Sequence, residues 1–252
     1  MLGPGAVLDR RGDFRLPSPW ASVTKLATAL AALVAVEEEV VDLDEPAGPP
    51  GSTVRHLLAH ASGLGFEGHR VLAAPGRLRI YSNAGFEVLG AHVARRAGLP
   101  FAQYMDEAVL GPLAMTGTRL TGSAAAGLEG PLDDLARLAA ELLSPTVVAA
   151  PTLAMATQVA FPGLAGVLPG FGRHSPLDWG LGFELRDAKS PHWTGATNSP
   201  ATFGHFGRTG SFLWVDPAAG MACVALSGAD FGAWAKVAWP ALSDAVLAQF
   251  RP

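Results

Sequence analysis

The sequence predicts an α+β fold, in which an antiparallel sheet is flanked by helices. Three observations lead to this prediction. An almost wholly apolar helix is expected early, helical patterns dominate the middle of the chain, and short strand patterns separated by turns follow residue 163. Strands and helices that are segregated along a chain in this way are typical of α+β folds, whereas α/β folds alternate them.

The N-terminal part is expected to form one strand and two helices. Segment 5–15 combines a short apolar stretch with turn residues and is interpreted as a strand and a turn. Segment 22–39 is expected to be a helix that is buried around most of its circumference, because Leu26–Val36 is apolar almost throughout. A loop rich in proline and glycine over 44–51 then leads to a helix over 53–60.

Three further helices are expected in the middle of the chain. The first covers 83–97 and should end near the glycine that follows, and the second covers 101–109. The third covers 132–143, where Asp133 or Asp134 would cap the helix or complement the positive end of its dipole.

The last third of the chain is expected to contain the sheet. Strands are expected over 180–185, 202–205, 211–215 and 221–226. Asp216–Gly220 is rich in turn-forming residues and should join the last two strands as a hairpin. A final helix over 231–250 could cover the sheet.

The composition indicates a compact globular protein. The chain has 252 residues, of which 49% are hydrophobic and 16% charged, so it can bury a sizeable core and is not expected to be disordered. A net charge of −4 without a basic cluster argues against nucleic-acid binding. The single cysteine, Cys223, excludes an internal disulfide and is expected to be a small core residue.

Export and membrane insertion are not indicated in the chain as given. Its N-terminus lacks the positive and then apolar plan of a signal peptide. Its longest apolar stretch, Leu26–Val36, is too short to cross a bilayer. A cytoplasmic location is therefore expected, unless a leader was removed or the native start lies further upstream.

Ser22 and Lys25 are the first candidate catalytic residues. Residues three positions apart lie on one face of a helix, so the hydroxyl and the amine can meet. An amine at the head of an apolar helix is partly desolvated and can lose its proton near neutral pH, which would make it a base for the serine. The alternative is a helix-capping serine beside a lysine whose stem packs on the helix end.

Tyr81-Ser82-Asn83 is a second candidate motif. A Tyr81 phenolate stabilised by Lys25 could take the proton of Ser22, and the sequence leaves open which of the two carries that proton at each step. The side chain of Asn83 could hold Lys25 and a substrate carbonyl, and it could also cap the helix that follows.

His205-Phe206-Gly207 is the third motif, and its place in the chain completes a resemblance. The order Ser-x-x-Lys, Tyr-x-Asn and basic-x-Gly resembles the signature of the penicillin-recognising serine enzymes. The Tyr-x-Asn form is similar to the class C β-lactamase branch and its esterase and D-peptidase relatives. Nearly the whole chain takes part, since other segments also resemble the family: Glu37–Pro46, Thr53–Leu64, Pro75–Gly76 and Leu110–Thr118.

The resemblance implies a β-lactamase/transpeptidase-like fold that forms a single domain over 1–252. Its helical part would span about 40–165, its sheet part would span about 1–39 and 166–252, and the active site would lie between them. By resemblance, Ser22 is the acylated nucleophile. The candidate catalytic residues are Ser22, Lys25 and Tyr81, and the candidate substrate-binding residues are Asn83, His205, Phe206, Gly207 and Arg208.

The third motif also has its own expected contributions. Gly207 would let a substrate lie close to the backbone. By resemblance, the amides of Ser22 and Arg208 would form the oxyanion hole. An alternative register would use Arg208-Thr209-Gly210 as the third motif.

Two features of this motif depart from the family. A hydroxyl residue that helps to hold the carboxylate of a β-lactam often stands where this chain has Phe206, although Arg208 could substitute for it. His205 replaces a lysine, and a histidine titrates near a pKa of about 6.5, so the fixed positive charge is weaker. Both departures favour neutral or aryl esters over penicillins.

The sequence therefore predicts a metal-free serine hydrolase that acts through an acyl-enzyme on small carboxylic esters or amides. No cofactor is expected, and His56 and His60 lack the glutamate of a His-Glu-x-x-His zinc site. A class C-type β-lactamase, a D-amino-acid peptidase and a penicillin- or peptide-binding module that acylates without turnover remain alternatives. The expected partners are small molecules, not nucleic acid or membrane, and the sequence leaves the natural substrate and the oligomeric state open.

Overall fold

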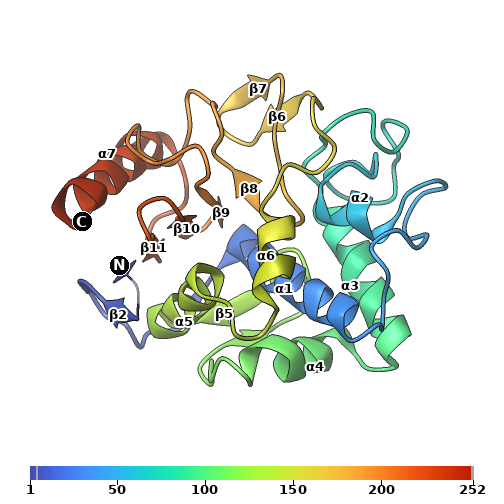
Figure 1. Ribbon diagram of the computed structural model, residues 1–252, viewed down its shortest axis with the longest axis horizontal. Coiled ribbons are helices and arrows are strands. Elements are labelled where there is room, and N and C mark those ends of the chain that lie inside the picture. Colours follow the sequence, from blue (N-terminus) through green and yellow to red (C-terminus); the bar gives the residue numbers. More distant parts are fainter. Residues whose placement is uncertain (4, 251–252) are drawn as a thin grey trace.

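A computed structural model describes residues 1–3 and 5–250 and confirms the α+β prediction (Figure 1). The main sheet is antiparallel, with the strand order β2-β1-β11-β10-β9-β8. Its strands are β1 (Leu2–Gly3), β2 (Ala6–Val7), β8 (Glu184–Leu185), β9 (Phe203–Phe206), β10 (Phe212–Asp216) and β11 (Met221–Ala225). Both ends of the chain meet in this sheet, because Leu2 pairs with Ala222.

Helices cover both faces of the main sheet. On one face lies α7 (Ala233–Phe250), and on the other lie α1 (Thr24–Glu37) and α5 (Leu132–Leu143) (Figure 1). The side chains of β10 alternate between the two layers, as the geometry of a strand requires. Phe212 and Trp214 pack in the aromatic cluster under α7, whereas the residues between and after them, Leu213 and Val215, pack in the cluster around α1.

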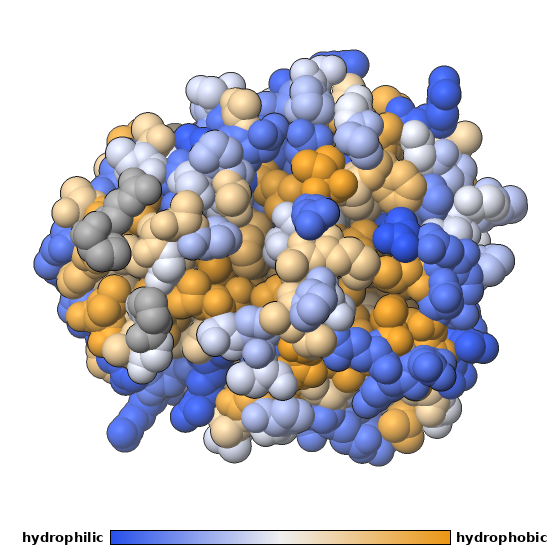
Figure 2. Space-filling model, viewed as in Figure 1, coloured by the Kyte–Doolittle hydropathy of each residue, from blue (hydrophilic) through white to orange (hydrophobic). Residues whose placement is uncertain are grey.

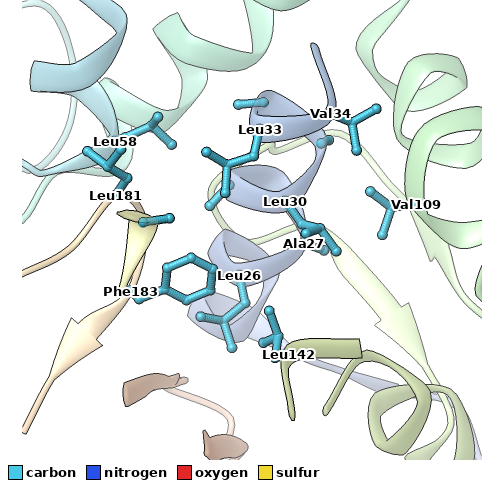
Figure 3. Packing of buried hydrophobic residues seen from close by; sticks show 14 of the residues in the cluster. Leu26, Ala27, Leu30, Leu33, Val34, Leu58, Val109, Leu142, Leu181 and Phe183 are labelled. Atoms are coloured by element: carbon cyan, nitrogen blue, oxygen red, sulfur yellow. The ribbon is translucent and has the colours of Figure 1, made fainter. Parts of the chain in front are cut away.

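The helix α1 is the centre of the larger core. Every residue from Thr24 to Ala35 is buried, in agreement with the apolar pattern of this segment. Figure 3 shows its apolar side chains lying among residues of several other segments: Leu58, Val109, Leu142, Leu181 and Phe183. Truncation of a leucine in such a core typically destabilises a protein by about 2–5 kcal/mol, so α1 is held firmly in position.

The remaining helices lie in the middle of the chain. They are α2 (Val54–Leu58), α3 (Asn83–Ala97), α4 (Phe101–Met105) with the π-helical turn η2 (Asp106–Leu110), and α6 (Ala150–Ala156). The helix α3 has the bounds that the sequence predicts, because Ser82 caps its start and Gly98, at φ 71°, ends it. None of the helices among the described residues is long and apolar enough to span a membrane.

Several short elements were not predicted. They are α6 and two small sheets, β3-β5-β4 and β6-β7. Their strands are β3 (Ser18–Pro19), β4 (Arg119–Leu120), β5 (Leu128–Gly130), β6 (Gly166–Leu168) and β7 (Gly172–His174). Strands of two or three residues are too short to show the alternation of apolar and polar residues that identifies longer ones.

The helix α5 has the bounds that the sequence predicts. No side chain caps it, but Asp133 and Asp134 lie in its first turn, where the sequence analysis expected an acidic residue to complement the helix dipole. The Asp134 carboxylate accepts hydrogen bonds from Gly117 and Thr118. Although α5 falls in the segment expected to form the helical part, it packs directly on β10 and β11 of the sheet.

An apolar hollow of about 330 Å³ lies where α5, α7 and the sheet meet. Its walls include Leu132, Ala136, Val224, Leu226 and Val246. Figure 2 shows hydrophobic residues gathering on this part of the surface. Cys223 also lines the hollow and is buried, as expected of a core residue.

Candidate active site

The structure brings Ser22, Lys25 and Tyr81 together at the start of α1. The Tyr81 hydroxyl donates a hydrogen bond of 2.7 Å to Ser22 Oγ, and Lys25 Nζ lies 3.4 Å from the same oxygen. Ser22 belongs to the 3₁₀ turn η1 (Ala21–Val23), and Lys25 is the second residue of α1, so one turn separates them. The hydroxyl of Ser22 is thus in reach of both groups that could move its proton.

The backbone just before Ser22 is strained and held in place from the sheet side. Ala21 has a φ of 47°, a left-handed conformation that a non-glycine residue adopts at a cost of roughly 1–2 kcal/mol. The hairpin between β9 and β10 grips this segment, because Thr209 Oγ1 donates to the carbonyl of Pro19 and Ser211 Oγ to that of Trp20. Such strain is common at functional sites, where surrounding contacts compensate for it.

Gly207 makes this close approach possible. A Cβ atom at position 207 would lie 2.3 Å from Ser211 Oγ and 2.5 Å from the carbonyl oxygen of Trp20. From the sequence, Gly207 is expected to let a substrate lie close to the backbone. The structure adds a second reason, since only glycine lets the end of β9 lie against the segment that leads to Ser22.

Lys25 is buried and fully engaged by two oxygen atoms. Its Nζ donates to Asn83 Oδ1 over 2.7 Å and to the carbonyl of Ala125 over 2.9 Å. Burial lowers the pKa of Lys25 to about 7, and the carboxylates of Glu87 and Glu67 limit this fall. A neutral amine has two N–H bonds and one lone pair, so these two acceptors leave the lone pair for Ser22.

Asn83 holds Lys25, as the sequence analysis expected, but it does not cap α3 with its side chain. Ser82 performs that task, since its Oγ accepts the amide hydrogen of Gly85 over 2.9 Å. The amide group of Asn83 faces Lys25 with its oxygen and Glu67 with its nitrogen, and Nδ2 donates to Glu67 Oε1 over 2.7 Å. A substrate carbonyl would therefore have to compete with Glu67 for this donor.

Tyr81 is surrounded by rings and stays protonated. Its ring lies 4.8 Å from that of His60, 5.9 Å from Phe66 and 6.0 Å from Trp179, measured between centroids. Burial raises the pKa of Tyr81, and its hydroxyl donates to Ser22. Of the two possibilities that the sequence leaves open, this burial favours a neutral Tyr81 over a phenolate. Lys25 Nζ lies over the Tyr81 ring, 4.8 Å from its centroid.

The ring of His205 lies next to that of Tyr81, with 5.6 Å between the two ring centroids. Its Nδ1 is 2.7 Å from the carbonyl oxygen of Phe206 and must be the protonated nitrogen, because a carbonyl only accepts. Burial and the nearby Lys25 lower the pKa of His205 to about 3, so the ring is neutral. The weaker positive charge expected from the Lys-to-His replacement is in fact no charge at neutral pH.

The side chain of Phe206 points away from Tyr81 and His205. Its side chain is 7% exposed and lies in the aromatic cluster under α7, with ring centroids 5.1 Å from Phe231, 5.6 Å from Trp193 and 5.8 Å from Trp239. The sequence analysis placed Phe206 among the substrate-binding candidates. The alternation of side chains along β9 turns its ring to the opposite face from His205, where it packs in the core.

The backbone amides of Ser22 and Arg208 have no hydrogen-bond partner among the described residues. They lie in η1 and in the β9–β10 hairpin, the two segments that Gly207 brings together. The Arg208 side chain is exposed. Both amides are thus free to donate hydrogen bonds to a charged oxygen, as the resemblance implies.

Arg79 is a structural residue that sequence reasoning missed. It is 1% exposed, and its guanidinium donates to the carbonyls of Ala59, Ala160, Phe161 and Leu177. Burial lowers the pKa of Arg79 to about 10, and no carboxylate of the described residues contacts it directly. This arginine ties three separate segments to the strand-like stretch that carries Tyr81, but a lone arginine before a tyrosine carries no sequence signal.

A cleft of about 310 Å³ opens beside Tyr81. Its lining is mainly apolar and includes Phe66, Leu78, Ile80 and Val167, with the exposed Arg173 among the polar residues. The cleft lies between the stretch around Tyr81 and the β6-β7 hairpin. It provides room for an apolar group beside Tyr81.

Comparisons with known proteins agree with this geometry. Residues 15–247 match the family model described as Beta-lactamase. A crystal structure described as a β-lactamase from Mycobacterium bovis is 56% identical, with all of this chain and 93% of that chain aligned at a TM-score of 0.98. The structure of EstCE1, described as a hydrolase with promiscuous acyltransferase activity, shares the fold at 21% identity, covering 86% of this chain and 81% of that chain at a TM-score of 0.72.

A curated relative matches over a shorter region. The D-alanyl-D-alanine-carboxypeptidase/endopeptidase AmpH of Escherichia coli K12 is 29% identical over 140 residues. This match covers 41% of this chain and 36% of the length of AmpH. The chain is thus similar to proteins described as a β-lactamase, a hydrolase with acyltransferase activity and a carboxypeptidase.

Proposed function

The chain belongs to the beta-lactamase family, whose members share a serine hydrolase fold, and we propose that it is a metal-free serine hydrolase acting through an acyl-enzyme on small carboxylic esters. One observation carries the proposal. Ser22 Oγ accepts a hydrogen bond from Tyr81 and lies beside a buried lysine whose other two hydrogen-bonding directions are occupied. This is the arrangement that an activated serine nucleophile needs.

In the proposed first half-reaction, Ser22 Oγ attacks the carbonyl carbon of the ester. Its proton passes to the lone pair of Lys25, and the amides of Ser22 and Arg208 stabilise the oxyanion. The C–O bond to the alcohol then breaks, and the Lys25 ammonium returns the proton to the leaving oxygen, directly or through the Tyr81 hydroxyl. The neutral alcohol leaves, and the acyl group stays on Ser22.

In the second half-reaction, water attacks the acyl carbon. Its proton passes to Lys25, either directly or through Tyr81, and the proton then returns to Ser22 Oγ as the carboxylic acid leaves. Lys25 is suited to this task because its pKa of about 7 lies close to neutral pH, where proton transfer in both directions is efficient. The high pKa of Tyr81 supports the role of a proton donor and relay rather than of the primary base.

Two features support esters over penicillins. The cleft beside Tyr81 is mainly apolar. His205 is neutral and Phe206 is turned into the core, so neither supplies a fixed charge or a hydroxyl for the carboxylate of a β-lactam. An ester without a carboxylate needs neither contact.

A β-lactamase is the second candidate. The specific observation that favours it is the 56% identity to the protein described as a β-lactamase from Mycobacterium bovis. The exposed Arg208 could supply the positive charge that His205 lacks. A D-amino-acid peptidase is a further alternative, given the partial match to AmpH. A binding module that acylates without turnover would keep the same residues and differ only in deacylation.

The test combines intact-mass measurement with product release. The protein is exposed to p-nitrophenyl acetate and, separately, to a penicillin, alongside the variants Ser22→Ala and Ser144→Ala. Ser144 is an exposed serine whose side chain makes no hydrogen bond within the described residues, so it serves as the control. We expect ester turnover that Ser22→Ala abolishes and Ser144→Ala retains, with slow penicillin acylation.

The other outcomes separate the alternatives. Rapid penicillin hydrolysis would replace the esterase proposal by a β-lactamase. A stable adduct on Ser22 without turnover would indicate a binding module. Undiminished ester turnover in Ser22→Ala would exclude Ser22 as the nucleophile.

A further inference from the structure

We propose that Glu67 and Glu87 are positioning residues that hold the two hydrogen-bond acceptors of Lys25 and thereby set the pH range in which Lys25 can take the proton of Ser22. The inference deepens the proposed function and rests on it, because it requires Lys25 to be the base. Neither glutamate contacts Lys25 directly. Each one holds a group that does.

Glu67 holds the side chain of Asn83. Asn83 Nδ2 donates to Glu67 Oε1 over 2.7 Å, and Asn83 Oδ1 accepts from Lys25 over 2.7 Å. Since a carboxylate only accepts hydrogen bonds, it forces the nitrogen of the amide towards itself and the oxygen towards Lys25. Without Glu67, the Asn83 amide could turn over and present a donor to the amine.

Glu87 holds the second acceptor from the opposite side. Its carboxylate accepts from the backbone amides of Ala124 and Ala125, at 3.3 Å each, and from the hydroxyl of Ser123. The carbonyl of Ala125 is the one to which Lys25 donates. Glu87 follows Asn83 by four residues on α3, so the two residues lie on the same face of that helix.

The carboxylates of Glu67 and Glu87 are also the charged groups that act on Lys25. Tyr81, His60 and His205 pack around it from other segments, and none of them is charged near pH 7. Burial raises the pKa of Tyr81, and burial lowers the pKa of His60 well below its usual value and that of His205 to about 3. Among the described residues that act on Lys25, this leaves Glu87 and Glu67 to stabilise its charged form.

The buried surroundings of Lys25 and the two exposed carboxylates have opposite effects on its protonation. Burial alone would favour a neutral amine over the whole physiological range, and such an amine would be a poor acid when the leaving group needs its proton. The carboxylates of Glu67 and Glu87, each separated from Lys25 by one group, stabilise its ammonium form. Lys25 can then both take a proton and return it. Both carboxylates are exposed, so salt should weaken their effect.

The chain permits a direct test, because its lysines are only Lys25, Lys189 and Lys236. With ¹³C-labelled lysine, the Cε signals can be followed by NMR as the pH changes, and the variants Lys25→Met and Lys236→Arg assign them. The variants to compare are Glu67→Gln and Glu87→Gln, which keep an oxygen acceptor and remove the charge. Glu107→Gln is the matched control, because Glu107 is exposed on η2 and its side chain bonds only to Gln103 within 1–3 and 5–250.

We expect each glutamine variant to lower the midpoint of Lys25 titration by about 0.5 pH unit and to move the acidic limb of kcat/KM for the ester by the same amount. The shift should shrink in 1 M salt, and Glu107→Gln should show none. An unchanged Lys25 midpoint in both Glu67→Gln and Glu87→Gln would overturn the inference. So would a shifted midpoint that leaves the acidic limb of kcat/KM where it was.

A purely structural role for Glu67 gives a different result. Glu67→Gln would then behave like the unaltered protein, and only Glu67→Ala would lower kcat, without moving the Lys25 midpoint. The proposed function fails on a separate observation, namely ester turnover that survives in Ser22→Ala. The NMR titration still decides in that case whether the two carboxylates control the protonation of Lys25.

Discussion

Two regions of the molecule each bury a lysine, and they use it in different ways. Lys25 and Lys189 have similar burial, at 0% and 5% exposure. Lys189 Nζ lies 2.8 Å from Glu184 Oε1, so its charge is neutralised in direct contact. The carboxylates that act on Lys25, those of Glu67 and Glu87, are each separated from it by one group, Asn83 or the main chain at Ala125.

The difference shows what makes a buried lysine reactive. Around Lys189, Glu184 also accepts hydrogen bonds from His192 and Trp193, and together these groups form a closed ionic cluster. Burial alone would raise the pKa of Glu184, but the charges of His192 and Lys189 lower it to about 2. A carboxylate in direct contact with a buried lysine keeps it charged and stabilises the fold. Carboxylates that are separated from the lysine by one group leave its amine free to change its protonation state.

The largest expected effect comes from removing the reactive lysine. Lys25→Met should lower kcat for the ester by about 10³-fold, as is typical for the loss of a general base. Its free energy of unfolding near pH 7 should not fall, because methionine avoids the desolvation of a buried amine. Steady-state kinetics and urea denaturation check both parts, and a variant with normal kcat would remove Lys25 from the mechanism.

The matching change in the other region should affect stability instead. Lys189→Met leaves Glu184 buried with one partner fewer, which typically destabilises a protein by about 3–5 kcal/mol. The activity of the folded fraction should stay within about twofold of the unaltered protein. The double variant Glu184→Gln with Lys189→Met should recover part of the stability, and an undiminished unfolding midpoint in Lys189→Met would show that this ion pair is unimportant.

The hydroxyl of Tyr81 is the next group to test. Tyr81→Phe keeps the ring contacts with His60, Phe66 and Trp179 and removes the hydrogen bond to Ser22. The loss of a proton donor should reduce kcat by about 10²-fold while the unfolding midpoint changes little. Tyr104→Phe is a suitable control, because the hydroxyl of Tyr104 bonds to Glu38 away from the site. Equal kcat in both variants would contradict the role of Tyr81.

The smallest effect is a pH dependence of stability. Burial lowers the folded-state pKa of Lys25 to about 7, from an ordinary value of 10.5. Between these values the unfolded chain binds more protons than the folded one, so the free energy of unfolding should rise with pH, by up to about 1.4 kcal/mol per pH unit. Urea denaturation at pH 7, 8 and 9 should show this rise relative to Lys25→Met, and parallel curves for the two proteins would contradict the lowered pKa.

The parts that sequence reasoning anticipated depend on local patterns. The apolar run of α1 predicts its burial, and a serine and a glycine at the two ends of α3 account for its bounds. The convergence of Ser22, Lys25 and Tyr81 follows from helical spacing and from the order of the motifs. Their catalytic roles remain proposals, but their positions are those that the resemblance implies.

The parts that were missed depend on partners that lie far apart in the chain. Arg79 binds main-chain carbonyls, and Glu87 binds main-chain amides, so no side-chain pattern marks these contacts. Glu67 reaches Asn83 across a loop. The direction of Phe206 depends on which face of β9 meets α7, and a strand that is buried on both faces carries no alternation from which this could be read.

The contacts of Arg79 also have a consequence for the order of folding. Ser22 and Lys25 are neighbours on one turn, so their pairing can form as soon as α1 does. Arg79, two residues before Tyr81, bonds to carbonyls that are 20, 81, 82 and 98 residues distant in the chain. Contacts of such long range form slowly, because the intervening loops must close first. The hydroxyl of Tyr81 should therefore reach Ser22 late in folding. A partly folded chain should then lack a complete catalytic site.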